Sequence, residues 1–485
     1  MRNKFILLLI LILGLGLRLY KVKAPLADHH SWRQADSAAV IRNLAFGGWD
    51  ILHPQVNNFV PNNAKGLANP QRYFFEDFPL SFDIYPALLL RVLGNQTAVL
   101  RLSSIIFSLL TLIFLNWLVA DLVTPTAGLL AAFIYAVLPF SIFFSRGVFQ
   151  EIPLNFYAVS SLFFLNRYLR EEKWSWFGGS VILSSLLFLT KPYALVFLLP
   201  QVLLFWQKEG IKAIRNWRTW AFFVASLIPF ALWWLWVRNF PEGMPYSVWL
   251  FNEGGIRFKG SFFYWIFAQR LGMLILGFWG ILFFGAGLLL LNQYSDGVFY
   301  GWLAGLLVYV FVIAKGNVTH DYYQVPFLPV SAYFMAKGII GILGWQKKFW
   351  QKTTASFLII IFLGFSLAFS WYQVRDFYNL TSGIDLAGEW VNRNTPPESL
   401  VIAGDGADPT LLYNTNRRGW TVGYGSIFEN TKETVEKFRA EGADYYVTTT
   451  LGQIKNTPFY QYLKENYQLI KETDQFVVFD LRGKK

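Results

Sequence analysis

The sequence predicts an α-helical integral membrane protein that ends in a small soluble α/β domain. The hydrophobic fraction is 54% without glycine, and only 15% of the 485 residues are charged. Soluble chains have about 25% charged residues. The shortfall lies before Trp371, and charged and polar residues return from about Thr381 onward. The chain therefore divides into a membrane domain, residues 1–380, and a C-terminal domain, residues 381–485.

The membrane domain is predicted to be a helix bundle. Backbone amides cannot go unpaired in hydrocarbon, and the apolar runs are continuous rather than alternating. A spanning helix needs roughly 20 apolar residues, and several runs here are shorter but end in Trp or Tyr. We predict about eleven spans, at Phe5–Tyr20, Ala98–Ala120, Ala127–Phe144, Pro153–Leu169, Phe177–Thr190, Pro192–Trp206, Trp220–Val237, Leu271–Leu291, Phe299–Ile313, Val325–Leu343 and Ala355–Trp371.

The first apolar run is predicted to be a retained helix rather than a cleaved signal peptide. Arg2 and Lys4 precede it, but Arg18, Lys21 and Lys23 crowd the end where cleavage needs small residues.

The distribution of Lys and Arg predicts the orientation, because cytoplasmic loops are enriched in both. With a cytoplasmic N-terminus, three basic loops fall inside, around Arg170, Lys212 and Lys348. The same count places residues 21–97 (the first loop), 238–270 and everything after Trp371 outside. We therefore expect a multi-pass protein of the cell (plasma or inner) membrane with an extracytoplasmic C-terminal domain.

The C-terminal domain is predicted to alternate strands and helices, which is typical of an α/β domain. The predicted strands are Leu400–Ala403, Tyr445–Thr449 and Phe476–Phe479, and the predicted helices are Thr431–Ala440 and Phe459–Asn466. This domain looks self-contained and accessory.

The formal charge of +12 does not indicate nucleic acid as a partner here, because the basic residues stand in short loops between apolar runs. They fit topology signals and contacts to anionic lipid. The chain has no cysteine and only four histidines, and it lacks the HExxH, P-loop, Rossmann and EF-hand patterns. No cofactor is indicated by motif, and a divalent metal is left open.

The first loop opens with Asp28-His29-His30-Ser31-Trp32-Arg33-Gln34-Ala35-Asp36, followed by a predicted interfacial helix at Ser37–Phe46. Carboxylates beside histidines and an arginine could supply a general base and its partners. The same composition is also compatible with a loop that is exposed to solvent and has no catalytic role.

Four further groups of polar residues fall on the predicted outer face. Glu76 and Asp77 close the first loop, and Glu151 stands near Arg146 where the third span emerges, as a functional acid or as an Arg146–Glu151 ion pair. Lys191 could hold a phosphate or extend to the lipid headgroups. The fourth cluster comprises His320, Asp321, Tyr322 and Tyr323. Convergence of distant helices on one face favours a site there.

Taken in order, these motifs resemble the polytopic glycosyltransferases of the C-type fold, in particular the bacterial relatives of protein O-mannosyltransferases and the lipid A aminoarabinose transferase. The resemblance covers roughly residues 5–345. It rests on the acidic loop after the first helix, Phe78-Pro79-Leu80, Arg146 followed by Glu151-Ile152-Pro153, Leu189-Thr190-Lys191-Pro192, and the segment from His320 to Pro326. Many relatives carry Asp-Glu in the first loop, whereas here His29 follows Asp28.

The resemblance implies inverting transfer of a sugar from a polyprenyl-phosphate donor to an acceptor hydroxyl on a protein, lipid or glycan. It implies an acidic general base in the first loop, for which we favour Asp28 over Asp36, Asp77 and Glu151. From their shared outer face we expect Lys191 and His320 to bind the donor phosphate, with Arg33 or Arg146 as a third cation. The residues then expected to orient the acceptor or support the site are Asp36, Asp77, Arg146, Glu151, Tyr322 and Tyr323.

Two other functions share this donor class. A transporter or flippase of lipid-linked saccharide would be expected to show repeats and broken midplane helices, and no repeat is evident. A polymerase of surface polysaccharide would use the same kind of lipid.

Overall fold

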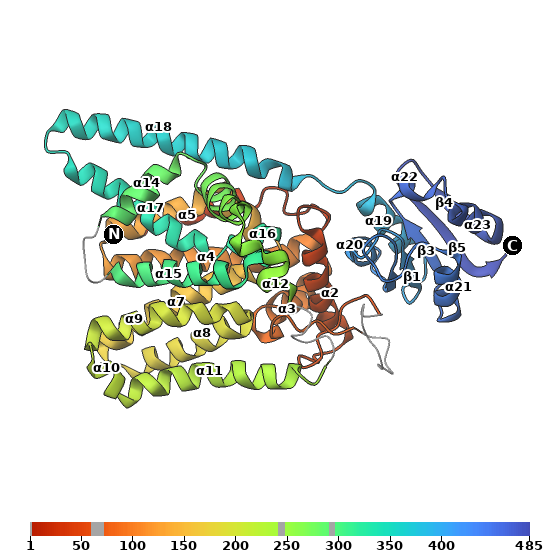
Figure 1. The fold of residues 1–485 in the computed structure, drawn as a ribbon, viewed down its shortest axis with the longest axis horizontal. Coiled ribbons are helices and arrows are strands. Elements are labelled where there is room, and N and C mark those ends of the chain that lie inside the picture. The colour runs from red at the N-terminus through yellow and green to blue at the C-terminus, as the bar shows by residue number, and fades with distance from the viewer. Residues whose placement is uncertain (1, 60–71, 241–247, 291–295) are drawn as a thin grey trace.

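The computed structural model describes residues 2–59, 72–240, 248–290 and 296–485. It consists of a helical bundle and a smaller domain built around a sheet, which lies beyond one end of the bundle (Figure 1). We call this end the domain-facing end. The helices of the bundle run along its long axis, with α11 at one edge and α18 at the other.

Each predicted span contains helix. Leu291, the predicted end of one span, lies outside the described residues, as do residues 60–71 of the first loop. The elements of the bundle are α1 (Arg2–Arg18), α4 (Thr97–Leu122), α5 (Pro125–Val137), α6 (Pro139–Ser145), α7 (Glu151–Glu171), α8 (Trp174–Thr190), η2 (Pro192–Phe197), α9 (Leu198–Glu209), α10 (Lys212–Arg215), α11 (Trp217–Val237), α13 (Gly260–Phe263), η5 (Tyr264–Ile275), α14 (Gly280–Leu289), α15 (Gly297–Val312), α17 (Phe327–Trp345) and α18 (Phe349–Val374).

Within the described residues, four helices are long and apolar enough to cross a membrane, or up to six with two bent pairs, and three shorter apolar helices accompany them. The first bent pair is α5–α6, with a bend of 68°. Proline cannot donate the helical hydrogen bond, so Pro139 ends α5 and begins a new helix. The second pair is Gly260–Ile275 with α14, bent by 113°, where Gly277 and Phe278 both have positive φ.

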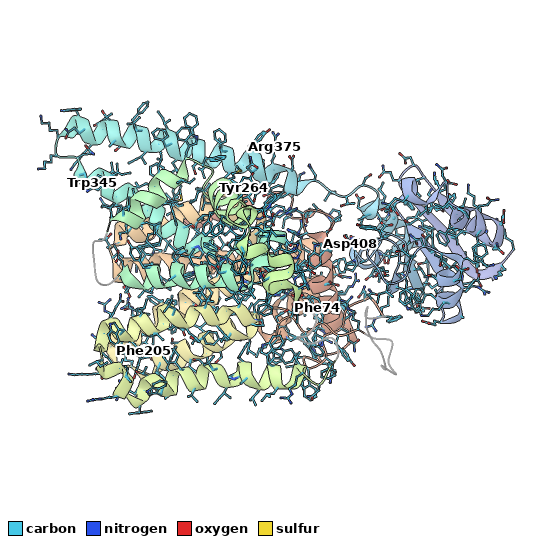
Figure 2. The ribbon with its side chains drawn as sticks, in the orientation of Figure 1. Phe74, Phe205, Tyr264, Trp345, Arg375 and Asp408 are labelled. Atoms are coloured by element: carbon cyan, nitrogen blue, oxygen red, sulfur yellow. The ribbon has the colours of Figure 1, made fainter. Side chains whose placement is uncertain are left out.

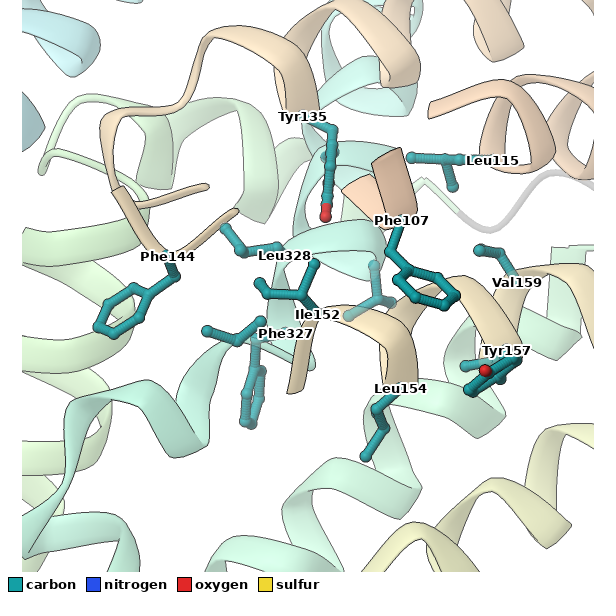
Figure 3. Close-up of a cluster of buried hydrophobic side chains, with 14 of the residues drawn as sticks. Phe107, Leu115, Tyr135, Phe144, Ile152, Leu154, Tyr157, Val159, Phe327 and Leu328 are labelled. Atoms are coloured by element: carbon teal, nitrogen blue, oxygen red, sulfur yellow. The ribbon is translucent and has the colours of Figure 1, made fainter. Parts of the chain in front are cut away.

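The core of the bundle is aromatic and aliphatic. Figure 3 shows Phe107 of α4, Tyr135 of α5, Ile152 of α7 and Phe327 of α17 meeting in one cluster, and all are at least 90% buried. Packing between lipid-embedded helices favours small residues that let backbones approach. Gly287 of α14 lies against α17, where an added Cβ would meet the carbonyl oxygen of Phe334 at 1.9 Å.

Short elements close the domain-facing end: α2 (Ser31–Gly47), η1 (Pro79–Ser81), α3 (Ile84–Leu93), α12 (Trp249–Asn252), η4 (Glu253–Phe258), α16 (Ala314–Thr319), η7 (Asp321–Gln324) and η8 (Arg375–Tyr378). The predicted interfacial helix at Ser37–Phe46 is part of α2. Most of its length is buried, and it packs against α3 and against α20 of the C-terminal domain.

The C-terminal domain has a five-stranded mixed sheet in the order β2-β1-β3-β5-β4. The strands β1, β2 and β3 are parallel, and β5 pairs antiparallel with β3 and β4. The three predicted strands are β1, β3 and part of β5, and the two predicted helices are α21 and α23. The elements are α19 (Ile384–Asn394), β1 (Leu400–Ala403), α20 (Thr410–Asn414), β2 (Arg418–Thr421), α21 (Lys432–Ala440), β3 (Tyr445–Thr448), α22 (Leu451–Ile454), α23 (Pro458–Asn466), β4 (Tyr467–Glu472) and β5 (Val477–Lys484).

This domain has hydrophobic clusters of its own and also contacts the first loop. Asn58 of the first loop forms a parallel bridge with Gly419, so the loop continues the sheet beyond β2. The amide of Asn58 also donates to the hydroxyl of Thr421 at 3.0 Å. On α20, Asn414 donates to the carbonyl of Leu26 at 3.0 Å. The domain is therefore held by the residues that lead into and follow α2.

Candidate active site

The polar side chains singled out in the sequence gather at the domain-facing end of the bundle, around the N-terminal half of α2. They come from the first loop, from the ends of α6, α7 and α8, and from η7, which are far apart in the sequence. In Figure 2 this region is found near Phe74, on the side of the bundle that faces Asp408 of the C-terminal domain.

Asp28 is held by two arginines. Its Oδ2 accepts hydrogen bonds from Arg146 at 2.7 Å and from Arg101 at 3.0 Å, and its Oδ1 accepts one from Gln34 at 2.7 Å. The residue is 4% exposed. An ion pair this deeply buried is costly to break by removing one partner. Arg146 therefore pairs with Asp28 and not with Glu151, the ion pair considered from the sequence.

Glu76 connects the two predicted phosphate ligands. Its Oε2 contacts Lys191 Nζ at 2.6 Å and Arg33 Nη2 at 3.2 Å. Its side chain is 40% exposed, whereas those of Lys191 and Arg33 are 5% and 0% exposed. Burial alone would raise the pKa of Glu76, but the charges of Arg33 and Lys191 outweigh it and hold this pKa well below its usual range. Glu76 is thus an accessible carboxylate between two buried cations.

Arg33 has N–H groups that make no hydrogen bond with the described residues. Its Nη2 donates to Gln150 at 2.7 Å, and its guanidinium lies over the ring of Phe74 at 4.7 Å, with Phe74 labelled in Figure 2. Its Nε and Nη1 have no hydrogen-bond partner among the described residues, although both are buried. A guanidinium offers five donors in a planar fork that suits phosphate.

His29, His30 and Asp321 form a second centre. The Nε2 atoms of both histidines lie 2.8 Å from the two oxygens of Asp321, and Arg270 approaches the same carboxylate at 3.7 Å. The ligand-type atoms of the three residues lie within 4.8 Å of one another. Two imidazoles and a carboxylate are a donor set that zinc accepts. The pKa of Asp321 is strongly lowered, because the hydrogen bonds and charges of the histidines outweigh its burial.

His320 stands among aromatic rings. It stacks on Tyr322 with ring centres 5.3 Å apart and lies 5.3 Å from Trp32. Burial lowers the pKa of His320 to about 4. This histidine is therefore neutral at pH 7 and can offer a phosphate one N–H donor but no charge. Tyr322 and Tyr323 are both buried, and Tyr322 stacks on Phe149 at 5.4 Å.

Three more buried acids surround this region. Burial raises the pKa of Asp36 to about 6 despite nearby Arg72 and Arg33, and it raises that of Asp77 to about 6 despite Lys191 and Arg33. Glu151, the first residue of α7, accepts a hydrogen bond from Tyr193 at 2.9 Å on one oxygen. Its other oxygen has no partner within the described ranges.

The structure thus brings the predicted residues into one region but joins them in pairs that the sequence did not show. Sequence reasoning placed Glu76 in a polar cluster without giving it a role, and it missed Arg101. Glu76 carried the same signal as its neighbour Asp77. Arg101 could have been noticed as a charge inside an apolar run, because such a residue needs a buried partner.

Comparison with known proteins agrees with this architecture. The family model of dolichyl-phosphate-mannose-protein mannosyltransferases matches residues 77–236. No curated protein sequence matches the chain. Among solved structures, ArnT from Cupriavidus metallidurans bound to undecaprenyl phosphate superimposes with a TM-score of 0.65 at 14% identity, covering 98% of this chain and 97% of that one.

The archaeal oligosaccharyltransferase from Archaeoglobus fulgidus is also similar. Its complex with zinc and sulfate gives a TM-score of 0.63 at 14% identity, covering 97% of this chain and 72% of that one. Its complex with an inhibitory peptide and a dolichol-phosphate gives 0.60 at 12% identity, covering 98% and 74%. The chain has the C-type glycosyltransferase fold. The predicted fold class and the predicted resemblance to polytopic glycosyltransferases are thereby confirmed.

Within this C-type fold, the matched segment of the family model begins at Asp77 and ends in α11. It includes Asp77, Arg146, Glu151 and Lys191, and it leaves out α2 and η7. The match at the level of sequence therefore includes Lys191 but neither Glu76 nor Arg33, and the full-length agreement is one of fold.

Proposed function

We propose that the chain transfers a sugar from a polyprenyl-phosphate donor to an acceptor hydroxyl, with inversion, at the extracytoplasmic surface of the cell membrane. One observation carries the proposal: Lys191 and Arg33 converge on Glu76, and Arg33 keeps two buried donors without a partner among the described residues. Buried cations with spare donors are what a leaving phosphate requires. The similar structures that hold undecaprenyl phosphate and dolichol-phosphate support this donor class.

The reaction forms one bond to the anomeric carbon and breaks another. The acceptor hydroxyl gives its proton to a carboxylate, and its oxygen forms a bond to the anomeric carbon. The bond from that carbon to the phosphate oxygen breaks on the opposite face, and polyprenyl phosphate leaves with the electron pair. Fixed cations stabilise the charge that develops on the phosphate without reorganising.

Lys191 and Arg33 are proposed to bind that phosphate, with His320 as a neutral donor. Without a phosphate, Glu76 balances both cations. A bound phosphate competes with Glu76, whose side chain is exposed enough to turn away. Asp77, Glu151, Tyr322 and Tyr323 are proposed to orient the acceptor.

Asp28 is the proposed general base. Its two arginines hold Oδ2 in place. Within the described residues Oδ1 accepts only from the amide of Gln34, so this oxygen retains a lone pair for a proton. The competitors are Asp36 and Asp77, because a pKa of about 6 lies nearer the operating pH of a base. We propose that Arg146 acts through Asp28 by fixing its position, and that a divalent metal, where one is used, binds His29, His30 and Asp321.

The proposed function is tested with purified protein and a labelled polyprenyl-phosphate sugar. Release of polyprenyl phosphate together with a glycosylated acceptor is expected. Movement of intact donor across a vesicle membrane without cleavage would instead identify a flippase, and successive addition of identical units would identify a polymerase.

The base is tested in the same assay. Asp28→Asn is expected to bind donor and to lose about 10² to 10⁴ in rate. Normal turnover in Asp28→Asn together with loss in Asp36→Asn would move the base to Asp36. Asp474→Asn, an exposed carboxylate of the C-terminal domain, is the control.

A further inference from the structure

A cavity of about 600 Å³ lies between the C-terminal half of α2 and the C-terminal domain, and we call it the junction cavity. Its volume falls within the roughly 300–1,000 Å³ of small-molecule sites. The bundle side contributes Arg42, Asn43 and Phe46 from α2, with Asn57 and Asn95. The domain side is formed by residues 397–400 and 416–418. None of these residues belongs to the site described above.

The charge of the junction cavity is unbalanced. Three arginines line it, Arg42, Arg417 and Arg418, and none makes an ion pair with any described residue. Glu398 is the one acid among its lining residues in the described part of the chain. A guanidinium taken out of water without a counter-ion is costly. The arrangement therefore favours a bound anion.

The three arginines differ in their hydrogen-bond partners. These partners show which arginine stabilises the domain and which is available to a ligand. Arg417 is 3% exposed and donates to the carbonyl of Thr395 at 2.8 Å, so it is part of the domain framework. Arg42 reaches the carbonyl of Tyr413 at 3.3 Å and lies over its ring at 4.3 Å. Arg418 makes a single long side-chain contact, 3.4 Å to Asn43. Arg418 is therefore the cation most free to bind a ligand.

The remaining lining is suited to hydroxyl groups. Asn43, Asn57, Asn95 and Asn416 place four amides around the cavity. Asn43 and Asn57 already donate to the carbonyls of Gln55 and Arg417, so Asn95 and Asn416 are the amides more available to donate to and accept from hydroxyl groups. Phe46 is 56% exposed and offers one apolar face. Lipid tails would need a continuous apolar lining, which this cavity lacks. Amides, guanidinium groups and one aromatic face together fit a sugar that carries a negative charge.

We propose that the junction cavity binds an anionic sugar unit of the acceptor. This inference rests on the proposed function and identifies the acceptor as a saccharide with a carboxylate or phosphate group. The helix α2 connects the proposed phosphate site to the junction cavity. Arg33 of the phosphate site lies near its start, and Arg42 of the cavity lies nine positions later. At 1.5 Å per residue, the anionic unit binds roughly 14 Å along the helix from Arg33. The acceptor therefore reaches the site as an extended chain.

The test uses the full-length protein in detergent and measures binding by calorimetry, without donor. The probes are a uronic-acid oligosaccharide, a neutral glucose oligosaccharide of equal length, and inorganic phosphate. The uronic-acid probe is expected to bind best, and Arg418→Gln is expected to weaken it about tenfold or more, because it removes a charge-assisted hydrogen bond. Arg393→Gln, an exposed arginine of α19, is the control and should bind as the native chain does.

Equal binding of the charged and neutral oligosaccharides would overturn the proposal. So would unchanged binding in Arg418→Gln, or phosphate binding as tight as the saccharide. Donor cleavage is measured separately in the same variant and should be unaffected when water is the acceptor. If the native chain cleaves no donor but still binds the uronic-acid probe through Arg418, the proposed function fails and the saccharide site stands.

Discussion

Arg146 ends the broken helix pair α5–α6 and donates to Asp28, which lies just beyond α1, at 2.7 Å. The same carboxylate oxygen contacts Arg101 of α4 at 3.0 Å. The start of the first loop is thereby fixed to two other helices of the bundle. The kink at Pro139 turns α6 away from the axis of α5, and Arg146 follows at the end of α6.

Removing Arg146 should destabilise the protein more than removing an exposed arginine. Arg146→Ala leaves Asp28 with one cation, and breaking a buried ion pair typically costs about 3–5 kcal/mol. Because both changes affect one contact, Arg146→Ala combined with Asp28→Asn should cost less than the sum of the two. Thermal unfolding in detergent measures this, with exposed Arg375→Ala as control. Additive effects would show that the two side chains are not coupled.

Lys191→Ala should weaken binding of polyprenyl phosphate and slow turnover. It removes a buried cation from the proposed phosphate site and leaves Glu76 paired with Arg33 alone. Adding Glu76→Gln should recover part of the affinity, because it removes the competing negative charge. Equilibrium binding of labelled polyprenyl phosphate distinguishes the variants, with Lys173→Ala as matched control. Native affinity in Lys191→Ala would exclude this residue from the phosphate site.

Asp36 should make stability depend on pH. Its pKa rises from 3.8 to about 6 on folding, so the folded protein holds its proton more tightly than the unfolded chain. Stability is therefore lost as pH rises from about 4 to about 6, by up to roughly 3 kcal/mol. Asp36→Asn should unfold at a higher temperature than the native chain at pH 7.5, and this difference should shrink toward pH 4. A constant difference across that range would contradict the raised pKa.

The proposed orientation predicts opposite reporter signals at two positions. A reporter fused after Lys352 should report the cytoplasm, and one fused after Leu481 should report the outside. The cytoplasmic signal after Lys352 is expected because Lys347 and Lys348 make this loop basic, and cytoplasmic loops are enriched in Lys and Arg. The same side for both fusions would refute the orientation.

The sequence predicted the helical segments well because an apolar run in hydrocarbon has few alternatives. It did not reveal the 113° bend before α14, which depends on the positive φ of Gly277 and Phe278. Within the site, residue types and chain order located Asp28, Arg33 and Lys191 correctly at one end. Their partners depend on three-dimensional packing, which no local pattern encodes. The sequence located the C-terminal α/β domain but not its contacts with the first loop, since Asn58 is 363 residues from its partner Thr421.

The bridge between the first loop and the sheet edge also bears on how the protein is made. The ribosome delivers Asn58 early and Thr421 only after a further 363 residues, which takes roughly 20–70 s at about 5–20 residues per second. During that interval the segment around Asn58 has emerged without the strand that it later accompanies. The nascent chain therefore carries an unpaired edge through most of its synthesis, and α2 can be enclosed only when translation is nearly finished.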